Sequence, residues 1–367
     1  MPSAAAVNAG PEKVELVGTS REVGLQHGRL LKSKIRAQVD VYDAIFQRTS
    51  KLDWQGVRAI AGTYRATIER LTPEIYTEMV GIAEGAGLDL LDIVALNCRS
   101  EIALGNFSDG CTSMAWKTEK DGVILAQNWD WTASVKDNCV FMSIEKPGKP
   151  KIYMITEAGV VGKIGFNSAS VGTNLNAIRA KPTDTSKLPV HVLLRVCLES
   201  SSAAAAVTNM EILGGIASAQ HILIADADVA ESLELTPKGN VYLSTNESEN
   251  GIVCHTNHLI RNKYVDEPPW LAGSPIRLER IEKLTSNLAM GTKPVTAEML
   301  RRQVFSDVFN SPQAICCQED PSRPIETRSS TLFCIIMRFQ HGQEPSAEVV
   351  WGKPGSGLES AILKMPW

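Results

Sequence analysis

The sequence predicts an α+β fold, because its hydrophobic periodicity changes at one point of the chain. About the first hundred of its 367 residues show mainly helical periodicity. From Cys111 onward the pattern has the period of two that is typical of β-strands, and helical patterns return in three later stretches. The change falls on the segment 108–112, which contains the dipeptide Gly110-Cys111.

The N-terminal segment is predicted to form one short strand followed by four helices. The strand covers 13–17, and the helices cover 21–47, 54–70, 73–86 and 90–104.

Three features of these helices carry predictions of their own. Gly24 and Gly28 flank His27, and glycine costs a helix roughly 1 kcal/mol relative to alanine, so we expect close packing against a neighbour. We interpret His27 as a structural histidine rather than a catalytic one. Arg99 and Glu101 form either a solvated last turn or part of a pocket beside Cys111.

A β-hairpin is predicted immediately after the change of pattern. Strand-like runs at 113–116 and 123–130 flank the tripeptide 120–122, which contains Asp-Gly, a strong hairpin signal. The hairpin would return Asn128 and Asp130 to the neighbourhood of Cys111. Asp130 is therefore a candidate for holding an amine at Cys111 by a charge-assisted hydrogen bond, and its alternative role is to cap a turn.

The rest of the chain is predicted to be mainly strand. Helices are expected at 189–210, 277–286 and 296–308, and strands at 140–144, 151–156, 171–176, 217–225, 234–235, 241–243, 251–259, 332–337 and 347–351. Asn174 and Asn176 are two residues apart in a strand, so both side chains are expected on the same face of it. Glycines between 157 and 167 do not make a nucleotide-binding loop, because neither G-x-G-x-x-G nor G-K-[ST] is present.

The polar run at the end of the strand 251–259 contains two histidines. His255 and His258 would face opposite ways on a strand, which argues against a metal site. Asn257, between them, is a candidate oxyanion donor, because a neutral amide N–H can stabilise developing negative charge.

Composition argues against several functional classes. The chain is 44% hydrophobic and 21% charged with a net charge of −4, which is typical of a soluble globular protein and gives no sign of nucleic-acid binding. Eight cysteines form no C-x-x-C pair, so no metal is expected. No signal peptide, membrane-spanning stretch or C-terminal peroxisomal tripeptide is recognisable, and we expect a cytoplasmic protein without a membrane partner.

The dipeptide Gly110-Cys111 suggests a site of self-cleavage. Gly110 has no side chain to block its carbonyl, and the Cys111 thiol is placed to attack that carbonyl. Cleavage would give Cys111 a free α-amine, which titrates at about pH 8 and can act as the base for the thiol. Most Gly-Cys pairs are only a turn followed by a small buried residue, so the dipeptide alone leaves both interpretations open.

Four stretches in order resemble the fungal acyl-CoA:6-aminopenicillanic acid acyltransferases, or isopenicillin N acyltransferases, within the N-terminal-nucleophile hydrolases. They lie at 109–112, at 127–130, at 155–159 with 165–168, and at 255–258, and the resemblance spans nearly the whole chain. It implies an αββα sandwich made as an inactive precursor. The precursor would cut itself into a helical α-subunit, 1–110, and a β-subunit, 111–367, that stay intertwined in one globular unit.

The resemblance also implies the chemistry and the roles of individual residues. Cys111 would form a thioester and pass the acyl group from acyl-CoA, a co-substrate rather than a bound cofactor, to the amine of a β-lactam nucleus or to water. By position, Asp130 orients the nucleophile and Asn257 supplies the oxyanion donor. Ser113 assists self-cleavage, and Thr327 and Arg328 lie in the substrate region.

The chain departs from the family pattern in three places, and three functions stay open. Thr327 stands where serine is expected and Ala219 where the family has a hydroxyl, and the peroxisomal tripeptide is absent. The departures bear on the acyl acceptor more than on the cysteine chemistry. The first hypothesis is a self-processing acyltransferase acting on small molecules, the second an amidohydrolase, and the third a non-catalytic relative.

Overall fold

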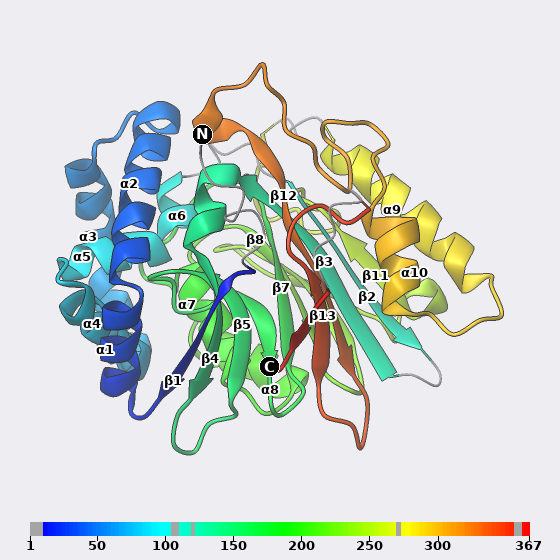
Figure 1. Cartoon of the computed structure of the whole chain (residues 1–367), viewed down its shortest axis with the longest axis horizontal. Coiled ribbons are helices and arrows are strands. Elements are labelled where there is room, and N and C mark those ends of the chain that lie inside the picture. Colours follow the sequence, from blue (N-terminus) through cyan, green and yellow to red (C-terminus); the bar gives the residue numbers. More distant parts are fainter. Residues whose placement is uncertain (1–9, 104–109, 119–121, 269–272, 356–361) are drawn as a thin grey trace, which may run out of the picture.

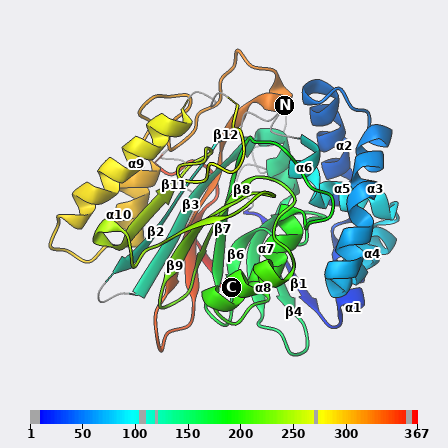
Figure 2. The ribbon, with the colours of Figure 1, turned by 180° about the vertical axis from the view of Figure 1, so that it is seen from behind.

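Two β-sheets stacked face to face form the centre of the molecule (Figure 1). The computed structural model describes residues 10–103, 110–118, 122–268, 273–355 and 362–367. Helices α7 and α8 cover the outer face of the first sheet, with α1 to α6 beside them, and α9 and α10 cover the second sheet (Figures 1 and 2). The layers are therefore α, β, β, α, as expected.

The first sheet has eight strands in the order β1-β4-β5-β6-β7-β8-β9-β10, and the second has six in the order β11-β2-β3-β12-β13-β14. All neighbours are antiparallel except β1 and β4, which are parallel. In chain order the strands are β1 Glu12–Val17, β2 Cys111–Thr118, β3 Gly122–Thr132, β4 Cys139–Glu145, β5 Ile152–Glu157, β6 Ile164–Asn167, β7 Gly172–Ala177, β8 Gln220–Ala225, β9 Ala230–Leu235, β10 Val241–Ser244, β11 Ile252–His255, β12 Ser329–Phe339, β13 Ser346–Val350 and β14 Leu363–Met365.

The helices lie mainly before β2 and between the later strands. They are α1 Ser20–Leu30, α2 Lys32–Thr49, α3 Trp54–Leu71, α4 Pro73–Ala86, α5 Leu90–Asn97, α6 Arg99–Ala103, α7 Val190–Leu198, α8 Ala203–Ile212, α9 Ser274–Ala289 and α10 Ala297–Leu300. Short turns add η2 Ala133–Asn138, η3 Glu249–Gly251, η4 Arg301–Phe305, which is a π-helix, and η5 Ile325–Thr327.

Three of the predicted helices were wrong as single helices, because each is divided in two. The helix expected at 21–47 breaks at Leu31, and the one expected at 90–104 breaks at Cys98, with residue 104 outside the described part. The helix expected at 189–210 ends at Leu198, and α8 starts afresh where the Ser202 side chain accepts from the Ala205 N–H. A single non-helical residue barely shifts the 3.6-residue pattern, so the first two breaks leave little trace in the sequence.

The helices α1 and α4 pack with their backbones almost in contact, as the glycines indicated. A Cβ on Gly24 would lie 2.1 Å from the carbonyl oxygen of Glu78, and one on Gly28 would lie 2.2 Å from that of Ile82. Gly81 on α4 faces back toward α1 in the same way. Larger residues at these positions would force the helices apart.

We expect Gly24→Ala to lower the free energy of unfolding by about 1–3 kcal/mol, because the added methyl group must displace the α4 backbone. Gly62→Ala on α3 is the matched control, since a Cβ there meets only the Leu91 side chain, at 3.9 Å. Alanine at 62 should stabilise the helix by up to about 1 kcal/mol. Chemical denaturation of both variants measures the difference, and equal effects would contradict the packing account.

His27 is a structural histidine. It is fully buried and its Nε2 accepts a hydrogen bond of 2.9 Å from the Gly159 N–H. Burial, together with the charge of Arg195, lowers the pKa of His27 to about 3, so the ring is neutral and acts as an acceptor. It joins α1 to the turn that follows β5.

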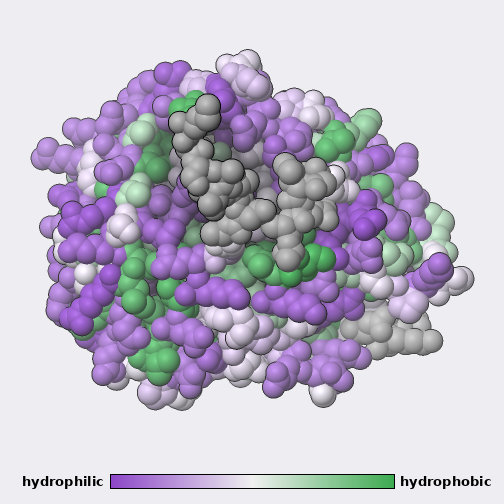
Figure 3. All heavy atoms as spheres, viewed as in Figure 1, coloured by the Kyte–Doolittle hydropathy of each residue, from purple (hydrophilic) through white to green (hydrophobic). Residues whose placement is uncertain are grey.

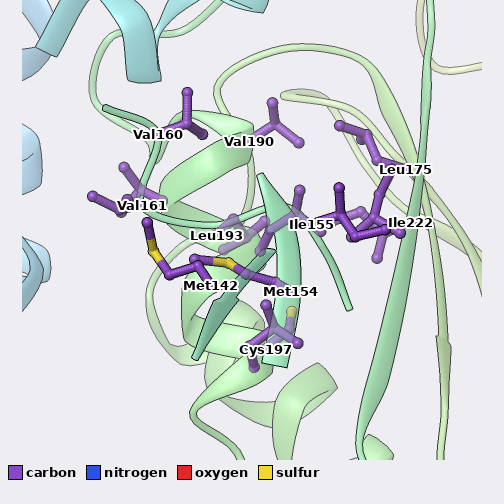
Figure 4. Packing of buried hydrophobic residues seen from close by; sticks show 14 of the residues in the cluster. Met142, Met154, Ile155, Val160, Val161, Leu175, Val190, Leu193, Cys197 and Ile222 are labelled. Carbon is purple, nitrogen blue, oxygen red and sulfur yellow. The ribbon is translucent and has the colours of Figure 1, made fainter. Parts of the chain in front are cut away.

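The main hydrophobic cluster contains residues from both sides of residue 110. Figure 4 shows the packing of α7 on the outer face of the first sheet, where Met142 and Met154 meet Leu193 and Cys197. Strand β1, from the N-terminal segment, pairs with β4 along its whole length. Residues before and after Cys111 therefore share one sheet and one core.

The surface is mostly polar on the face shown in Figure 3, with apolar residues in small separate groups. Among the described residues, no helix combines the length and the apolar character that crossing a bilayer requires.

Candidate active site

Cys111 is the first residue of β2, which lies between β11 and β3 in the second sheet. β2 pairs on one side with β3, where Cys111 is opposite Trp129, and on the other side with β11, where Ser113 is opposite His255. The predicted hairpin is confirmed, and its turn at 119–121 lies outside the described residues. The pairing brings Asp130 and the segment after β11 to Cys111, which is only 2% exposed.

Both sides of the Gly110–Cys111 peptide bond are held by hydrogen bonds. The Gly110 carbonyl accepts from the main-chain N–H of Asp130 at 3.1 Å, and the Cys111 N–H donates to Asn257 Oδ1 at 2.7 Å. The next carbonyl, of Cys111, accepts from Arg277 Nη1 at 2.7 Å and from Asn176 Nδ2 at 3.1 Å. The main chain is thus fixed before and after this bond.

Asn257 presents its amide oxygen to Cys111. Oδ1 accepts from the Cys111 N–H and from Arg277 Nη2 at 2.9 Å, and since both partners can only donate, they identify the oxygen. Nδ2 points away and donates to the Ala177 carbonyl at 3.0 Å. The role of Asn257 as an oxyanion donor stays a prediction, and from this geometry it requires the amide to turn.

Arg277 is one of the residues of this site that sequence analysis missed. It lies in the first turn of α9, is 5% exposed, and also donates to Thr112 Oγ1 at 3.0 Å. Its guanidinium places a permanent positive charge beside the Cys111 nitrogen, which favours the neutral form of an amine generated there. In the sequence it is one arginine of an ordinary helix, and nothing in its spacing separates it from a surface cation.

Glycine at position 110 is explained by its two charged neighbours. A Cβ on Gly110 would lie 3.2 Å from Asp130 Oδ2 and 3.1 Å from Arg277 Nη2. Any larger residue would therefore press on both groups. Asp130 is fully buried, and Thr331 Oγ1 donates to its Oδ1 at 2.6 Å. That Asp130 orients the nucleophile stays a prediction, but its carboxylate does lie at the predicted cleavage site.

We expect Thr331→Val to reduce turnover about tenfold, because valine keeps the volume but removes the hydroxyl that holds the Asp130 carboxylate. Thr331 Oγ1 also accepts from the Cys317 N–H at 2.9 Å, so valine leaves that donor unpaired as well. Thr331→Ser keeps the hydroxyl and should retain most of the activity. Steady-state kinetics of the two variants measure the effect, and equal rates would show that the hydroxyl does not support Asp130.

Ser113 is connected to Cys111 through another side chain. Its Oγ donates to Asn176 Oδ1 at 2.6 Å, and Asn176 in turn holds the Cys111 carbonyl. Ser113 is fully buried. Its part in self-cleavage stays a prediction, and the connection to Cys111 through Asn176 supports an indirect role.

A small pocket that is partly open to solvent adjoins the Gly110–Cys111 bond. Its lining includes Gly110, Asp130, Asn257 and Arg277, together with Cys317 and Arg323 from the segment before β12. The pocket therefore lies beside the residues that hold Cys111.

Thr327 and Arg328 are close to this pocket in the sequence but are not part of its described lining, which contains Ser329. Arg328 Nη2 donates to the carbonyls of Pro321 and Arg323, at 3.0 and 2.9 Å. Thr327 Oγ1 donates to the Pro324 carbonyl at 3.2 Å. Both side chains shape the loop that carries Arg323, and their direct contact with substrate stays a prediction.

Arg99 and Glu101 do not form the solvated turn that was one alternative, since they are 4% and 1% exposed. Arg99 pairs with Glu157 at 2.7 Å, and Glu101 accepts from Ser218 Oγ at 2.7 Å. Neither belongs to the described lining of the pocket.

His258 lies against hydroxyl groups near the start of α9. Its Nδ1 lies 2.8 Å from Ser274 Oγ, and burial, followed by the charges of His255 and Arg277, lowers its pKa to about 4. No group of three His, Cys, Asp or Glu side chains suited to a metal occurs in the part of the chain that the structure describes.

Comparisons with known proteins show the family of this chain. Residues 116–355 match the family model described as acyl-coenzyme A:6-aminopenicillanic acid acyl-transferase. The chain is also 34% identical, over 352 residues, to the 40 kDa form of acyl-coenzyme A:6-aminopenicillanic-acid-acyltransferase of Emericella nidulans. That alignment covers 94% of each chain.

The chain belongs to this acyltransferase family. The matched segment contains Asp130, Asn257, Arg277 and Arg328 and begins after Cys111, while the Emericella relative aligns with nearly the whole chain.

One solved structure shows that the family member shares its fold, and a second solved structure aligns less well. A variant of conjugated bile acid hydrolase from Clostridium perfringens aligns with a TM-score of 0.50 at 12% identity, over 70% of this chain and 92% of that one. Penicillin V acylase from Agrobacterium tumefaciens aligns with a TM-score of 0.39 at 16% identity, over 66% of this chain and 83% of that one. The αββα fold expected for this acyltransferase family member is confirmed.

Proposed function

We propose that this family member is a self-processing cysteine acyltransferase that cuts itself at Gly110–Cys111. It then transfers an acyl group from acyl-CoA to the amine of 6-aminopenicillanic acid or of isopenicillin N, a reaction of antibiotic biosynthesis. The observation that carries the proposal is the pair of hydrogen bonds that bracket the Gly110–Cys111 bond, from Asp130 N–H to its oxygen and from its N–H to Asn257 Oδ1.

Self-cleavage follows from that pair. The Cys111 thiol attacks the Gly110 carbonyl carbon, and the oxygen that gains negative charge already accepts from the Asp130 N–H, a fixed donor of the kind that stabilises an oxyanion. The carbon–nitrogen bond breaks, the Cys111 nitrogen takes up the thiol proton, and a thioester between Gly110 and Cys111 forms. Water then hydrolyses the thioester and releases the thiol and a carboxylate on Gly110.

Acyl transfer uses the group that cleavage creates. The new α-amine lies where the Cys111 N–H now donates to Asn257, beside the Arg277 guanidinium, and as a neutral amine it can take the thiol proton. The thiolate attacks the carbonyl of the acyl-CoA, whose thiol leaves with that proton, and a Cys111 thioester forms. The acceptor amine attacks this thioester, the amide forms, and the Cys111 thiol is restored.

The two products of self-cleavage should remain together. β1 and helices α1 to α6 come from residues before Cys111, and β1 is hydrogen-bonded to β4 while α1 to α5 contribute to the common core. Separation would expose this core, so we propose a heterodimer of the fragments 1–110 and 111–367.

Two measurements on the purified protein test the proposal. Intact mass should show two fragments ending at Gly110 and beginning at Cys111. Incubation with phenylacetyl-CoA and 6-aminopenicillanic acid should yield penicillin G. Phenylacetate without penicillin G would instead identify an amidohydrolase, and an intact, folded chain without turnover would identify a non-catalytic relative.

A further inference from the structure

Two rows of buried polar residues face each other between the sheets, directly beside Cys111. In the first sheet, Asn176, His221 and Glu234 lie opposite one another on β7, β8 and β9. In the second, Ser113 lies opposite His255 on β2 and β11. The five residues, which we call the polar layer, are between 0% and 4% exposed. Because burying polar groups is costly unless they are hydrogen-bonded, their contacts should define where each proton lies.

The contacts of Asn176 show which nitrogen of His221 carries the proton. Its Nδ2 donates to the carbonyls of Cys111 and His255, at 3.1 and 3.4 Å, so its Oδ1 faces Ser113 and His221 as an acceptor. The His221 Nδ1, 3.0 Å from Oδ1, therefore carries a proton. Nε2 lies 2.9 Å from Ser232 Oγ and accepts from that hydroxyl.

His255 has an acceptor at each ring nitrogen. Nδ1 lies 2.8 Å from the Thr256 carbonyl and Nε2 lies 3.0 Å from Glu234 Oε1. The Glu234 carboxylate also accepts from the main-chain N–H groups of residues 260, 261 and 262. Burial alone would raise the pKa of Glu234, but these bonds and His255 lower it to about 2, so the carboxylate is ionised. Both nitrogens of His255 then donate, and the ring carries a positive charge.

The two histidine rings are stacked, with centroids 3.5 Å apart and planes 5° from parallel. A charged ring so close favours a neutral partner. Burial and the charge of His255 hold the pKa of His221 well below its ordinary value. Burial and the charge of His255 also lower the pKa of His258, which is therefore neutral near pH 7. One charged ring thus lies among neutral neighbours, with Glu234 as its counter-ion.

We propose that the His255–Glu234 ion pair and the stacked His221 ring are a positioning device for Cys111. They hold the Asn176 amide with its nitrogen toward the Cys111 carbonyl. A reversed Asn176 amide would face the Cys111 carbonyl with its oxygen and the His221 N–H with its nitrogen, so both contacts would be repulsive. The positioning role rests on the proposed function of Cys111 as the nucleophile, and none of these side chains needs to touch substrate.

The proton positions can be measured without any activity. We expect nitrogen NMR of the full chain labelled with ¹⁵N-histidine to show a proton on each nitrogen of His255, because each nitrogen faces an acceptor. His221 should be protonated at Nδ1 alone. His221→Asn and His255→Asn spectra assign the signals. A bare nitrogen on His255 at pH 6, or an Nε2 proton on His221, would overturn the proposal even if the chain never cuts itself.

The positioning role is tested by a pair of variants at His221. His221→Phe keeps a ring over His255 but removes the donor to Asn176, and it should slow both self-cleavage and kcat about tenfold or more with little change in KM. His221→Asn places an amide N–H where Nδ1 lies and should rescue most of the rate. Equal rates in the two variants would overturn the role.

A spectroscopic readout at Cys111 separates positioning from general damage. With cysteine labelled at the carbonyl carbon, the Cys111 signal should move in His221→Phe and stay in place in His221→Asn, because only the first loses the oriented Asn176 donor. Thermal unfolding of each variant reports whether it folds. An unchanged Cys111 signal in a folded His221→Phe chain would contradict the proposal, whatever the enzyme's activity.

Discussion

A chain with Cys111→Ala is expected to remain at its full length and to show no acyl transfer. The alanine has no atom that can attack the Gly110 carbonyl, so neither the thioester nor the free α-amine can form. Self-cleavage and acyl transfer should both fall below detection. The Cys111 thiol is the nucleophile of both reactions, and its attack on the chain also releases the α-amine that serves as the base. Denaturing gels or intact mass report cleavage, and the phenylacetyl-CoA assay reports transfer.

Two further variants sharpen that test. Cys254→Ala removes a half-buried thiol on β11 that lies near Thr285, and it should leave both cleavage and transfer intact. Cys111→Ser keeps a weaker nucleophile in the same place, so any residual cutting should be slow and at the same bond. Normal acyl transfer by Cys111→Ala would show that another group is the nucleophile.

Asn257→Ala is expected to lower turnover by a factor of about 10² or more. It removes the oxygen that accepts from the Cys111 N–H and from Arg277 Nη2, so two hydrogen bonds at the reacting bond are lost. Slow self-cleavage should accompany the loss, which intact mass taken over time can follow. Unchanged cleavage and turnover would show that Asn257 has no part in either step.

Asn257→Asp distinguishes the two roles that Asn257 could play. Aspartate keeps an oxygen toward Cys111 and Arg277 but loses the N–H that an oxyanion would need. If the oxygen is what matters, Asn257→Asp should retain clearly more activity than Asn257→Ala. If the amide N–H matters, the two variants should be equally inactive. The structure favours the first outcome, because Oδ1 faces Cys111 and Nδ2 is bonded to Ala177.

Much of the fold could be predicted because local patterns and local structure coincide. α4 begins at Pro73 and ends before Gly87, which has a left-handed φ of 62°, and both residues mark those ends in the sequence. The hairpin of β2 and β3 was equally visible. The breaks at Leu31 and Cys98 were not, because both residues are buried and hydrophobic, and they continue the pattern of the helices that they interrupt.

The site was predictable where its residues lie in distinctive stretches. Gly110, Cys111 and Asp130 belong to one hairpin, and Asn257 lies in a conspicuous polar run at the end of a strand. Arg277 and Thr331 were missed because their importance comes only from contacts across the sheets and layers. Arg277 reaches Cys111 from a separate helix, and Thr331 reaches Asp130 from the neighbouring strand.

By itself, the sequence determined the α+β class, the change from helical to strand periodicity at Gly110–Cys111, and the family resemblance. These depend on periodicity and on short motifs in a fixed order. Only the tertiary structure decided how Cys111 is held. Hydrogen bonds to its main chain come from residues far away in sequence, and the direction of the Asn257 and Asn176 amides depends on partners on other strands and on α9. Such directions follow from the stacking of two sheets, which no local pattern specifies.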